Sequence, residues 1–380
     1  MNTHRLLLLA IPAITLFHAV AFGATWVVDP AGQGNFTSIK PAIDAASMFD
    51  TILVRPGVYA EELRIAPERS GLLLKGDGPA SEIVVRADTI ALGIWFTDPA
   101  VRVERLTITG GAMLGGLVTQ GARVEIRDCI ITANNGPGGC HGVGGGMRID
   151  SGSDVLIEGC TIEENHDWEA PGGVIVWSSR ADIRGNVFRN NSACYGGAIE
   201  MYHCEGNGVS VIEENVFVGN TAEVWGGGIL NVDSSPIIRR NTFVANGDPA
   251  KPSIWVLGGK PEIARNIIVD SELAVYCFAY SGYPPSLPVI EENICWAIND
   301  TTLTNCGPTT DLLIVNPLFC DSTSGDFRVC ADSPAILGEE VVFGALGVGC
   351  PKCGDTPVRP ASWGFLKALF GTERRPISRD

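Results

Sequence analysis

The chain has 380 residues, of which 46 are glycine, 45% are hydrophobic and only 18% are charged. This composition excludes an intrinsically disordered chain and is typical of a β protein with many turns. The net charge of −16 excludes nucleic acid and anionic membrane surfaces as partners, and it disfavours strongly anionic polysaccharides unless calcium bridges the charges.

Residues 1–24 have the pattern of a secretory signal peptide. His4 and Arg5 precede an apolar stretch over residues 6–22, and the small residues Gly23 and Ala24 follow it. We expect cleavage after Gly23 or Ala24, with an uncleaved membrane anchor as the alternative. No later segment is long and apolar enough to span a bilayer. The sequence therefore predicts a secreted or cell-surface protein without a membrane span.

Residues 25–90 are expected to form a cap and the opening coils of the fold. The stretch 35–46 predicts a helix, with Thr37 or Ser38 as its N-cap. Short strands are predicted at 51–55, 63–65, 72–75 and 82–85. The helix would cover the open end of a sheet stack, where exposed strand edges otherwise recruit other chains.

Residues 91–300 contain a repeated unit that decides the fold. Each unit has an aliphatic residue, two polar residues, a Cys or Asn and an apolar pair, and it recurs every 23 to 31 residues. Asparagine tolerates left-handed backbone at a corner, and stacked asparagines form amide ladders. The sequence therefore predicts an all-β, single-stranded right-handed parallel β-helix with an N-terminal cap helix. The repeated Cys or Asn position falls at Leu106, Cys129, Cys160, Asn186, Asn215, Asn241, Asn266 and Asn293.

The twelve cysteines all follow the predicted signal peptide, so disulfides are expected in an oxidising compartment. Cys129 and Cys160 fall at the repeated position and are predicted to be buried free thiols. Cys320 with Cys330 is the best local candidate pair. Cys350 and Cys353 form an isolated CxxC, which suits a disulfide, half of a zinc site or a redox pair, with a disulfide favoured. No metal site and no cofactor are predicted.

The β-helix is expected to occupy residues 25–354, with 301–354 as its closing segment. Residues 355–380 form a separate tail. Apolar residues between Trp363 and Phe370 suit a short helix that folds back or a frayed end, with a sorting or docking segment as the alternative.

Two parts of the chain resemble known proteins. The runs 31-AGQGNFTSIKPAIDAA, 52-ILVRPGVYAEELRI and 72-LLLKGDGPASEIVV resemble the N-terminal part of pectin methylesterases and related proteins of the pectin-lyase-like superfamily. The run 315-VNPLFCDSTSGDFRVCADSPAILG resembles the closing segment of bacterial secreted parallel β-helix repeat proteins. The first resemblance covers about 60 residues and implies the fold more than the activity.

The catalytic residues that the resemblance implies are missing. Pectin methylesterases use aspartates in Asp-Phe-x-Phe-Gly and Gln-Asp-Thr segments, with glutamines and an arginine that stabilise the oxyanion. This chain has only Gln33 and Gln120, and Gly121 follows Gln120. Its Asp326-Phe327 lies in the closing segment. Paired aspartates of a polygalacturonase are absent too, so we carry over no catalytic residue.

Aromatic and acidic residues recur around the glycine pairs of the repeat, and stacking would place them on one side of the coil. Such a surface suits sugars, because aromatic rings pack on sugar faces and carboxylates bind hydroxyl groups. Alternatively, the aromatic residues pack on loops and the acids keep the surface soluble. The candidate glycan-binding residues are Trp168, Trp177, Tyr195, Glu200, Tyr202 and Trp225.

Two functions remain open. The first is a secreted, non-catalytic, monomeric β-helix protein whose long surface binds a polysaccharide or cell-surface glycan. The second is a divergent polysaccharide lyase or glycoside hydrolase that acts on the same face, with Glu200 and His203 as candidate catalytic groups. An enzyme needs at least two titratable side chains that converge on one substrate atom.

Overall fold

The computed structural model describes residues 23–136, 144–204, 206, 208–247, 251–279, 283–298, 303–307, 309–338, 340–351 and 353. Nearly all of the predicted signal peptide and the whole predicted tail lie outside these residues. Cys140 and His141, which the sequence placed near the candidate face, lie outside them as well. In the described part of the chain, no helix is long and apolar enough to cross a membrane.

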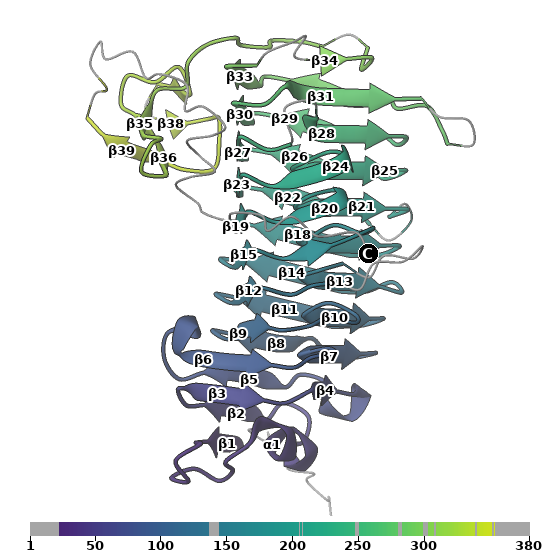
Figure 1. The fold of residues 1–380 in the computed structure, drawn as a ribbon, viewed down its shortest axis with the longest axis vertical. Helices are drawn as coiled ribbons and strands as arrows, with labels where there is room; N and C mark the ends of the chain where they lie inside the picture. Colours follow the sequence, from purple (N-terminus) through teal and green to yellow (C-terminus); the bar gives the residue numbers. More distant parts are fainter. Residues whose placement is uncertain are drawn as a thin grey trace, which may run out of the picture.

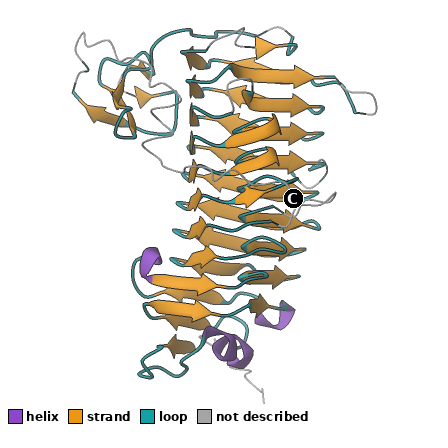
Figure 2. Ribbon diagram, viewed as in Figure 1, coloured by secondary structure: helices purple, strands orange, loops and turns teal. Residues whose placement is uncertain are grey.

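Three long parallel sheets form the body of the molecule, and each coil adds one strand to each sheet (Figures 1 and 2). Sheet A contains β1 (Thr25–Val28), β2 (Thr51–Val54), β5 (Leu73–Gly76), β8 (Val101–Glu104), β11 (Arg123–Arg127), β14 (Asp154–Glu158), β18 (Arg180–Arg184), β22 (Val211–Glu213), β26 (Ile237–Arg239), β29 (Glu262–Ala264) and β32 (Val289–Glu291). Sheet B contains β3 (Gly57–Ala60), β6 (Ile83–Arg86), β9 (Thr107–Thr109), β12 (Ile130–Thr132), β15 (Thr161–Glu163), β19 (Val187–Arg189), β23 (Val216–Val218), β27 (Thr242–Val244), β30 (Ile267–Val269) and β33 (Ile294–Trp296).

Sheet C is the third long sheet, and a small sheet D lies beside it in three coils. Sheet C contains β4 (Leu63–Ile65), β7 (Leu92–Trp95), β10 (Leu117–Gln120), β13 (Met147–Asp150), β17 (Val174–Trp177), β21 (Ile199–Tyr202), β25 (Ile229–Val232), β28 (Pro252–Leu257), β31 (Leu273–Phe278) and β34 (Leu303–Thr304). Sheet D contains β16 (His166–Asp167), β20 (Ser192–Tyr195) and β24 (Thr221–Trp225). The predicted parallel β-helix is confirmed.

The repeated asparagines stack in a single file, as the sequence predicts. The Asn186 side chain donates to Asn215 Oδ1 at 2.9 Å, and Asn215 donates to Asn241 Oδ1 at 3.0 Å. Each of these three Nδ2 groups also donates to a backbone carbonyl of the preceding coil. Cys129 and Cys160 continue the file as buried free thiols, and Cys160 Sγ accepts the backbone N–H of Cys129 at 3.4 Å.

The residue with left-handed backbone at this corner is not the asparagine, as expected from the sequence, but the residue before it. The residue before the ladder position has a positive φ, for example Glu214 at 58° and Arg240 at 52°, whereas the ladder asparagines do not. The ladder side chain is instead held inward by its own hydrogen bonds, so the turn before it absorbs the strain. A second buried ladder at the other end of the sheet B strands was not predicted. It contains Asn134, Asn165, Asn191, Asn220 and Asn246.

Helix α1 (Ile39–Ala45) lies at the first end of the stack, and short 3-10 turns follow at Pro67–Arg69 and Ala80–Glu82. Ile39, Ala42 and Ile43 are buried, so the helix packs its apolar face on the core. Ser38 is the N-cap residue, as predicted, but its side chain makes no capping hydrogen bond. Glu61 of a later coil accepts the backbone N–H of Ile39 at 3.0 Å and the Ser38 hydroxyl at 2.7 Å. A carboxylate therefore satisfies the helix N-terminus from outside the helix.

The C-terminal segment forms a small module beside the stack (Figure 1). It contains β35 (Phe319–Asp321), β36 (Asp326–Cys330) and β39 (Val348–Cys350) in one sheet, with β37 (Ile336–Leu337) and β38 (Glu340–Val341) as a hairpin. Phe319, Phe327 and Phe343 pack on the outer face of sheet B. The segment therefore folds back onto the side of the stack, where the sequence suggested a continuation that closes the coils.

The outer face of sheet B explains where the module binds. In the earlier coils this face carries polar residues, such as Glu163 and Arg189. From β23 onward it becomes apolar, with Val216, Val244 and Ile267 all buried against the module. The hydrophobic effect therefore directs the module to the later coils.

The cysteine pairing departs from the prediction. Cys320 is bonded to Cys350 and Cys330 to Cys353, so the predicted Cys320–Cys330 pair is wrong, although all four cysteines form disulfides. The parallel pairing of β36 with β39 brings Cys350 next to Cys330, which local spacing could not reveal. A third disulfide, Cys277–Cys306, joins neighbouring coils with a Cα–Cα distance of 4.9 Å. Cys306 follows the short edge strand β34 and is thus less constrained than a cysteine in the middle of a ladder.

Candidate functional site

The outer face of sheet C presents two columns of side chains, because strand residues alternate between the core and the exterior. Ile199 and Met201 of β21 point into the core, so Glu200 and Tyr202 point outward. One outer column contains Ile175, Glu200, Leu230, Trp255 and Tyr276. The other contains Trp95, Gln120, Asp150, Trp177, Tyr202, Val232, Leu257 and Phe278.

Aromatic side chains cover the later part of this face and contact one another from coil to coil. We call this surface the aromatic face, and its residues are Trp177, Tyr195, Tyr202, Trp225, Trp255, Tyr276, Phe278 and Tyr283. Ring centroids lie 4.9 Å apart for Trp177 and Tyr202, and 5.0 Å apart for Tyr195 and Trp225. Trp255 continues the row, 5.8 Å from Trp225 and 4.5 Å from Tyr276. All eight side chains are half-buried, so each keeps part of its ring open to solvent.

The structure thus brings together four of the aromatic candidates and separates one. Trp177, Tyr195, Tyr202 and Trp225 all belong to the aromatic face. Trp168 lies on the loop after β16, is 48% exposed and contacts the ring of His166 edge-on at 5.0 Å. It makes no ring contact with the aromatic face among the described residues, so it stands apart from the proposed surface.

Sequence reasoning missed Trp255, Tyr276, Phe278 and Tyr283. The prediction followed the glycine pairs, and these stop before β28. The asparagine repeat could have located Trp255, because it follows Asn241 by 14 positions, as Glu200 follows Asn186.

Glu200 lies beneath the aromatic face and is only 8% exposed. Burial, and to a smaller extent the carboxylate of Asp167, raises the pKa of Glu200 from its ordinary value of 4.5 to about 8. The carboxyl group of Glu200 is therefore mainly protonated at neutral pH. Gly196 lies in the loop next to Glu200 and has a φ of 62°, a backbone conformation that favours glycine.

Asp167 is fully buried between sheets D and C. Its Oδ1 accepts the backbone N–H groups of Glu169 and Ala170, at 2.8 and 2.9 Å. Its Oδ2 has no hydrogen-bond partner in the described part of the chain. A buried carboxylate without a full set of partners is costly, and such groups concentrate at functional sites.

The edge of the aromatic face carries polar groups that could orient a ligand. His203 Nδ1 lies 3.1 Å from Asp233 Oδ2, and the His203 ring meets Tyr202 edge-on at 4.3 Å. Burial, followed by its hydrogen bond to Tyr283, raises the pKa of Tyr202 to about 12. Arg148 lies over the Trp177 ring at 5.5 Å and pairs with Asp150 at 2.7 Å.

The candidate catalytic pair does not meet. Glu200 and His203 form no hydrogen bond with each other within the described ranges, and His203 pairs with Asp233 instead. Gln120, the one glutamine on this face, donates to the Ser151 hydroxyl at 3.3 Å. The carboxylate of Asp167 acts on Glu200 electrostatically.

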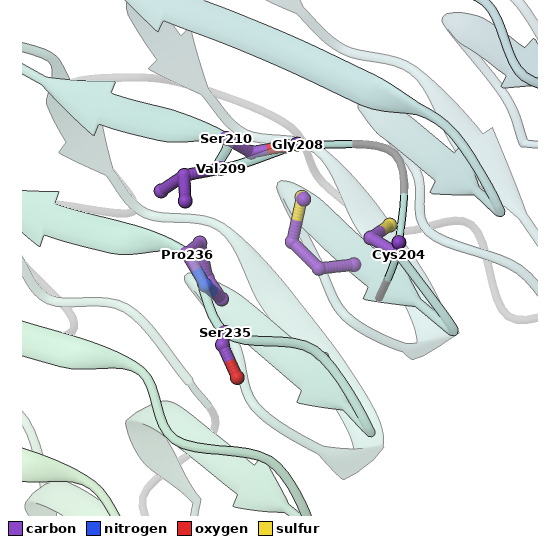
Figure 3. A pocket seen from close by; sticks show the side chains of 8 residues that line it. Cys204, Gly208, Val209, Ser210, Ser235 and Pro236 are labelled. Atoms are coloured by element: carbon purple, nitrogen blue, oxygen red, sulfur yellow. The ribbon is translucent and has the colours of Figure 1, made fainter.

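A separate hollow lies at the corner between sheets C and A, away from the aromatic face (Figure 3). Its volume is about 250 Å³, and Cys204, Val209, Ser210 and Pro236 are among the residues that line it. The long turn after β21 opens this space. The Cys204 thiol donates to the Val176 carbonyl at 3.2 Å, so it is held by the core.

Comparison with known proteins agrees with this architecture. The family described as "Right handed beta helix region" matches residues 86–246. The chain folds as a right-handed parallel β-helix. The matched residues contain the second asparagine ladder, the first ladder as far as Asn241 and half of the aromatic face.

The similar curated proteins are plant proteins. The chain is 27% identical to "Probable pectinesterase/pectinesterase inhibitor 17" of Arabidopsis thaliana over 65% of its own length and 44% of the relative's. It is 33% identical to "Probable pectinesterase 55" of the same plant, over 24% of this chain and 30% of the relative. The chain thus spans less than half the length of these relatives. Among solved structures, the pectin methylesterase from Aspergillus niger aligns over 78% of this chain and 91% of its own, with 14% identity and a TM-score of 0.41.

Proposed function

We propose that this β-helix protein binds a glycan along the aromatic face and does so without cleaving it. The observation that carries the proposal is the group of eight aromatic side chains on sheet C and beside it. Ring contacts join Trp177 with Tyr202 in the earlier coils. A second set of ring contacts runs from Tyr195 to Phe278 in the later coils. Sugar rings pack their C–H faces on aromatic rings, and hydroxyl groups bind the polar groups beside them. A carbohydrate ligand also fits the pectinesterase names of the curated relatives.

The size of the aromatic face suits a polymer more than a single sugar. The row extends from β17 to β31, which is four strand-to-strand steps in sheet C. At about 4.8 Å per step, the row is roughly 19 Å long. A chain of several sugar units lying along the stack would contact one or two rings in each coil.

The charge of the face favours a neutral glycan over a uronate polymer. Asp150 and Asp233 lie on or beside the aromatic face, and the whole chain carries a net charge of −16. Arg148 is paired with Asp150 and is not free to bind a carboxylate. Repulsion therefore weakens the binding of polygalacturonate unless calcium bridges the two surfaces.

A polysaccharide array probed with the purified chain tests the proposal. We expect retention of neutral polysaccharides without any new reducing ends or unsaturated products. Trp255→Ala should weaken binding by about 2 kcal/mol, or roughly 30-fold, because a central aromatic contact is lost. Phe49→Ala is the matched control, since Phe49 is 56% exposed and lies far from the face, near the first coil. No retention of any glycan, with or without calcium, contradicts the proposal.

One observation favours a second candidate, a divergent lyase or hydrolase on the same face. Glu200 has a pKa of about 8, so it would be a proton donor at neutral pH, and the carboxylate of Asp167 lies near it. This candidate predicts measurable turnover that Glu200→Gln abolishes while binding persists. The absence of products from uronate and neutral glycans eliminates it.

The proposal also includes export of the chain, directed by residues 1–24, and a monomeric state. Sequencing the N-terminus of the exported protein tests the first, and measuring its mass in solution tests the second.

A further inference from the structure

The C-terminal module brings three cysteine sulfur atoms close together and bonds a fourth to one of them. Cys320 and Cys330 come from the β35–β36 hairpin, and Cys350 and Cys353 come from the CxxC at the end of β39. The sulfur atoms of Cys320, Cys330 and Cys350 all lie within 4.8 Å of one another, and Cys353 is bonded to Cys330. Cys350 Sγ lies only 3.2 Å from Cys330 Sγ, although these two atoms belong to different disulfides.

We propose that these four cysteines form a tetrahedral zinc site when the two disulfides are reduced. Zinc holds four thiolates at about 2.3 Å, which places the sulfur atoms roughly 3.8 Å from one another. The sulfur atoms of Cys320, Cys330 and Cys350 are already close to that spacing, and Cys353, released from Cys330, would complete the set. The sequence alone offered half of a site, because an isolated CxxC supplies two ligands; the fold of the module supplies the other two.

The surroundings of the four sulfur atoms suit a metal site. Cys330 is fully buried, whereas Cys320, Cys350 and Cys353 are half-buried, so solvent reaches the cluster from one side only. The Arg328 side chain packs over Gly349, next to Cys350, and its guanidinium pairs with Asp326 at 2.6 Å.

The chemistry of the exchange balances. Each disulfide takes up two electrons from a phosphine, which becomes the phosphine oxide, and two protons from water, so two disulfides give four thiols. Zinc binding then releases the four thiol protons and forms four zinc–sulfur bonds. The module would thus be cross-linked in both states, by disulfides under oxidising conditions and by zinc under reducing ones.

The test uses the full chain, reduced with a phosphine, loaded with Zn²⁺ and separated from free metal. We expect one Zn²⁺ per chain, with Cys320, Cys330, Cys350 and Cys353 protected from alkylation in a mass-spectrometric map. Cobalt in place of zinc should give the absorption spectrum of a tetrahedral thiolate complex. The alkylation map needs no variant, so it remains informative if a cysteine variant folds poorly.

Variants complete the experiment. Cys353→Ser should reduce the retained zinc from one per chain to none. Cys194→Ser is the matched control, because Cys194 is a half-buried free cysteine on β20, in sheet D. The inference is overturned if the reduced chain retains no zinc, if Cys353→Ser retains as much as the unaltered chain, or if zinc protects other cysteines instead.

Discussion

Replacing Asn215 with alanine should destabilise the centre of the stack by several kcal/mol. The Asn215 side chain donates to Asn241 Oδ1 at 3.0 Å and to the Ile183 carbonyl at 2.8 Å. Its Oδ1 accepts both the backbone N–H and the side-chain Nδ2 of Asn186, each at 2.9 Å. Asn186 Nδ2 keeps a second acceptor, the Ile157 carbonyl, whereas the Asn186 backbone N–H keeps none.

The magnitude follows from this inventory. A buried donor left without a partner costs about 1–3 kcal/mol, and each further lost hydrogen bond costs about 0.5–1.5 kcal/mol. We therefore expect the Asn215→Ala substitution to lower the free energy of unfolding by about 3–6 kcal/mol. Cysteine at this position should cost less than alanine, because Cys160 already shows that a sulfur atom can accept the N–H of the neighbouring coil.

Two measurements check the prediction. The urea midpoint should fall for Asn215→Ala and remain unchanged for Asn135→Ala, whose exposed side chain lies outside both ladders. Because a solenoid can unfold in parts, hydrogen exchange gives the local test: the Asn186 amide should exchange at least about tenfold faster. Equal midpoints for the two variants, with unchanged exchange at Asn186, would refute the reasoning about the ladder.

Three further predictions follow from other parts of the molecule. Gly344→Val should weaken the packing of the module on sheet B, because Gly344 has a φ of 80° and an added Cβ would lie 2.6 Å from Ile267 Cδ1. The module should then be cleaved faster by proteases. An unchanged rate of proteolysis would contradict tight packing of the module. Stability should fall by a few kcal/mol as the pH rises from about 4.5 to 8, because folded Glu200 holds a proton that the unfolded chain releases. Glu200→Gln should reduce this slope without abolishing it, since burial also raises the pKa of Asp270 to about 7; an unchanged slope argues against the buried acid. Unreduced peptide maps should contain the pairs Cys277–Cys306, Cys320–Cys350 and Cys330–Cys353, and a Cys320–Cys330 peptide would contradict the fold of the module.

The stack of coils could be predicted from the sequence because each coil places the same kind of residue at the same corner, which gives a repeat along the chain. Every coil needs a small polar group at the same corner, so Asn186, Asn215 and Asn241 recur at nearly constant spacing. The backbone strain could not be assigned in the same way. Charged residues such as Glu214 and Arg240 adopt the left-handed conformation, although nothing in their side chains favours it. Tertiary stacking overrides their local preference.

The module and the candidate site were harder to predict, for two different reasons. The position of the module depends on contacts between distant residues, such as the Ala345 N–H and the Thr242 hydroxyl, which are 103 positions apart. The aromatic face was predicted only in part because the glycine pairs end before Trp255 while the coils continue. Its columns follow from strand register, which the asparagine spacing fixes more reliably than the loop signals do.

The fold-back of the C-terminal module changes how the solenoid can come apart. Within the stack each coil contacts only its neighbours, so a free end would unravel one coil at a time. The module instead touches four successive strands, from Val216 on β23 to Ile294 on β33. The module therefore cross-links the last four coils, which must unfold together. Unfolding that would otherwise begin at the edge strand has to wait until the module dissociates.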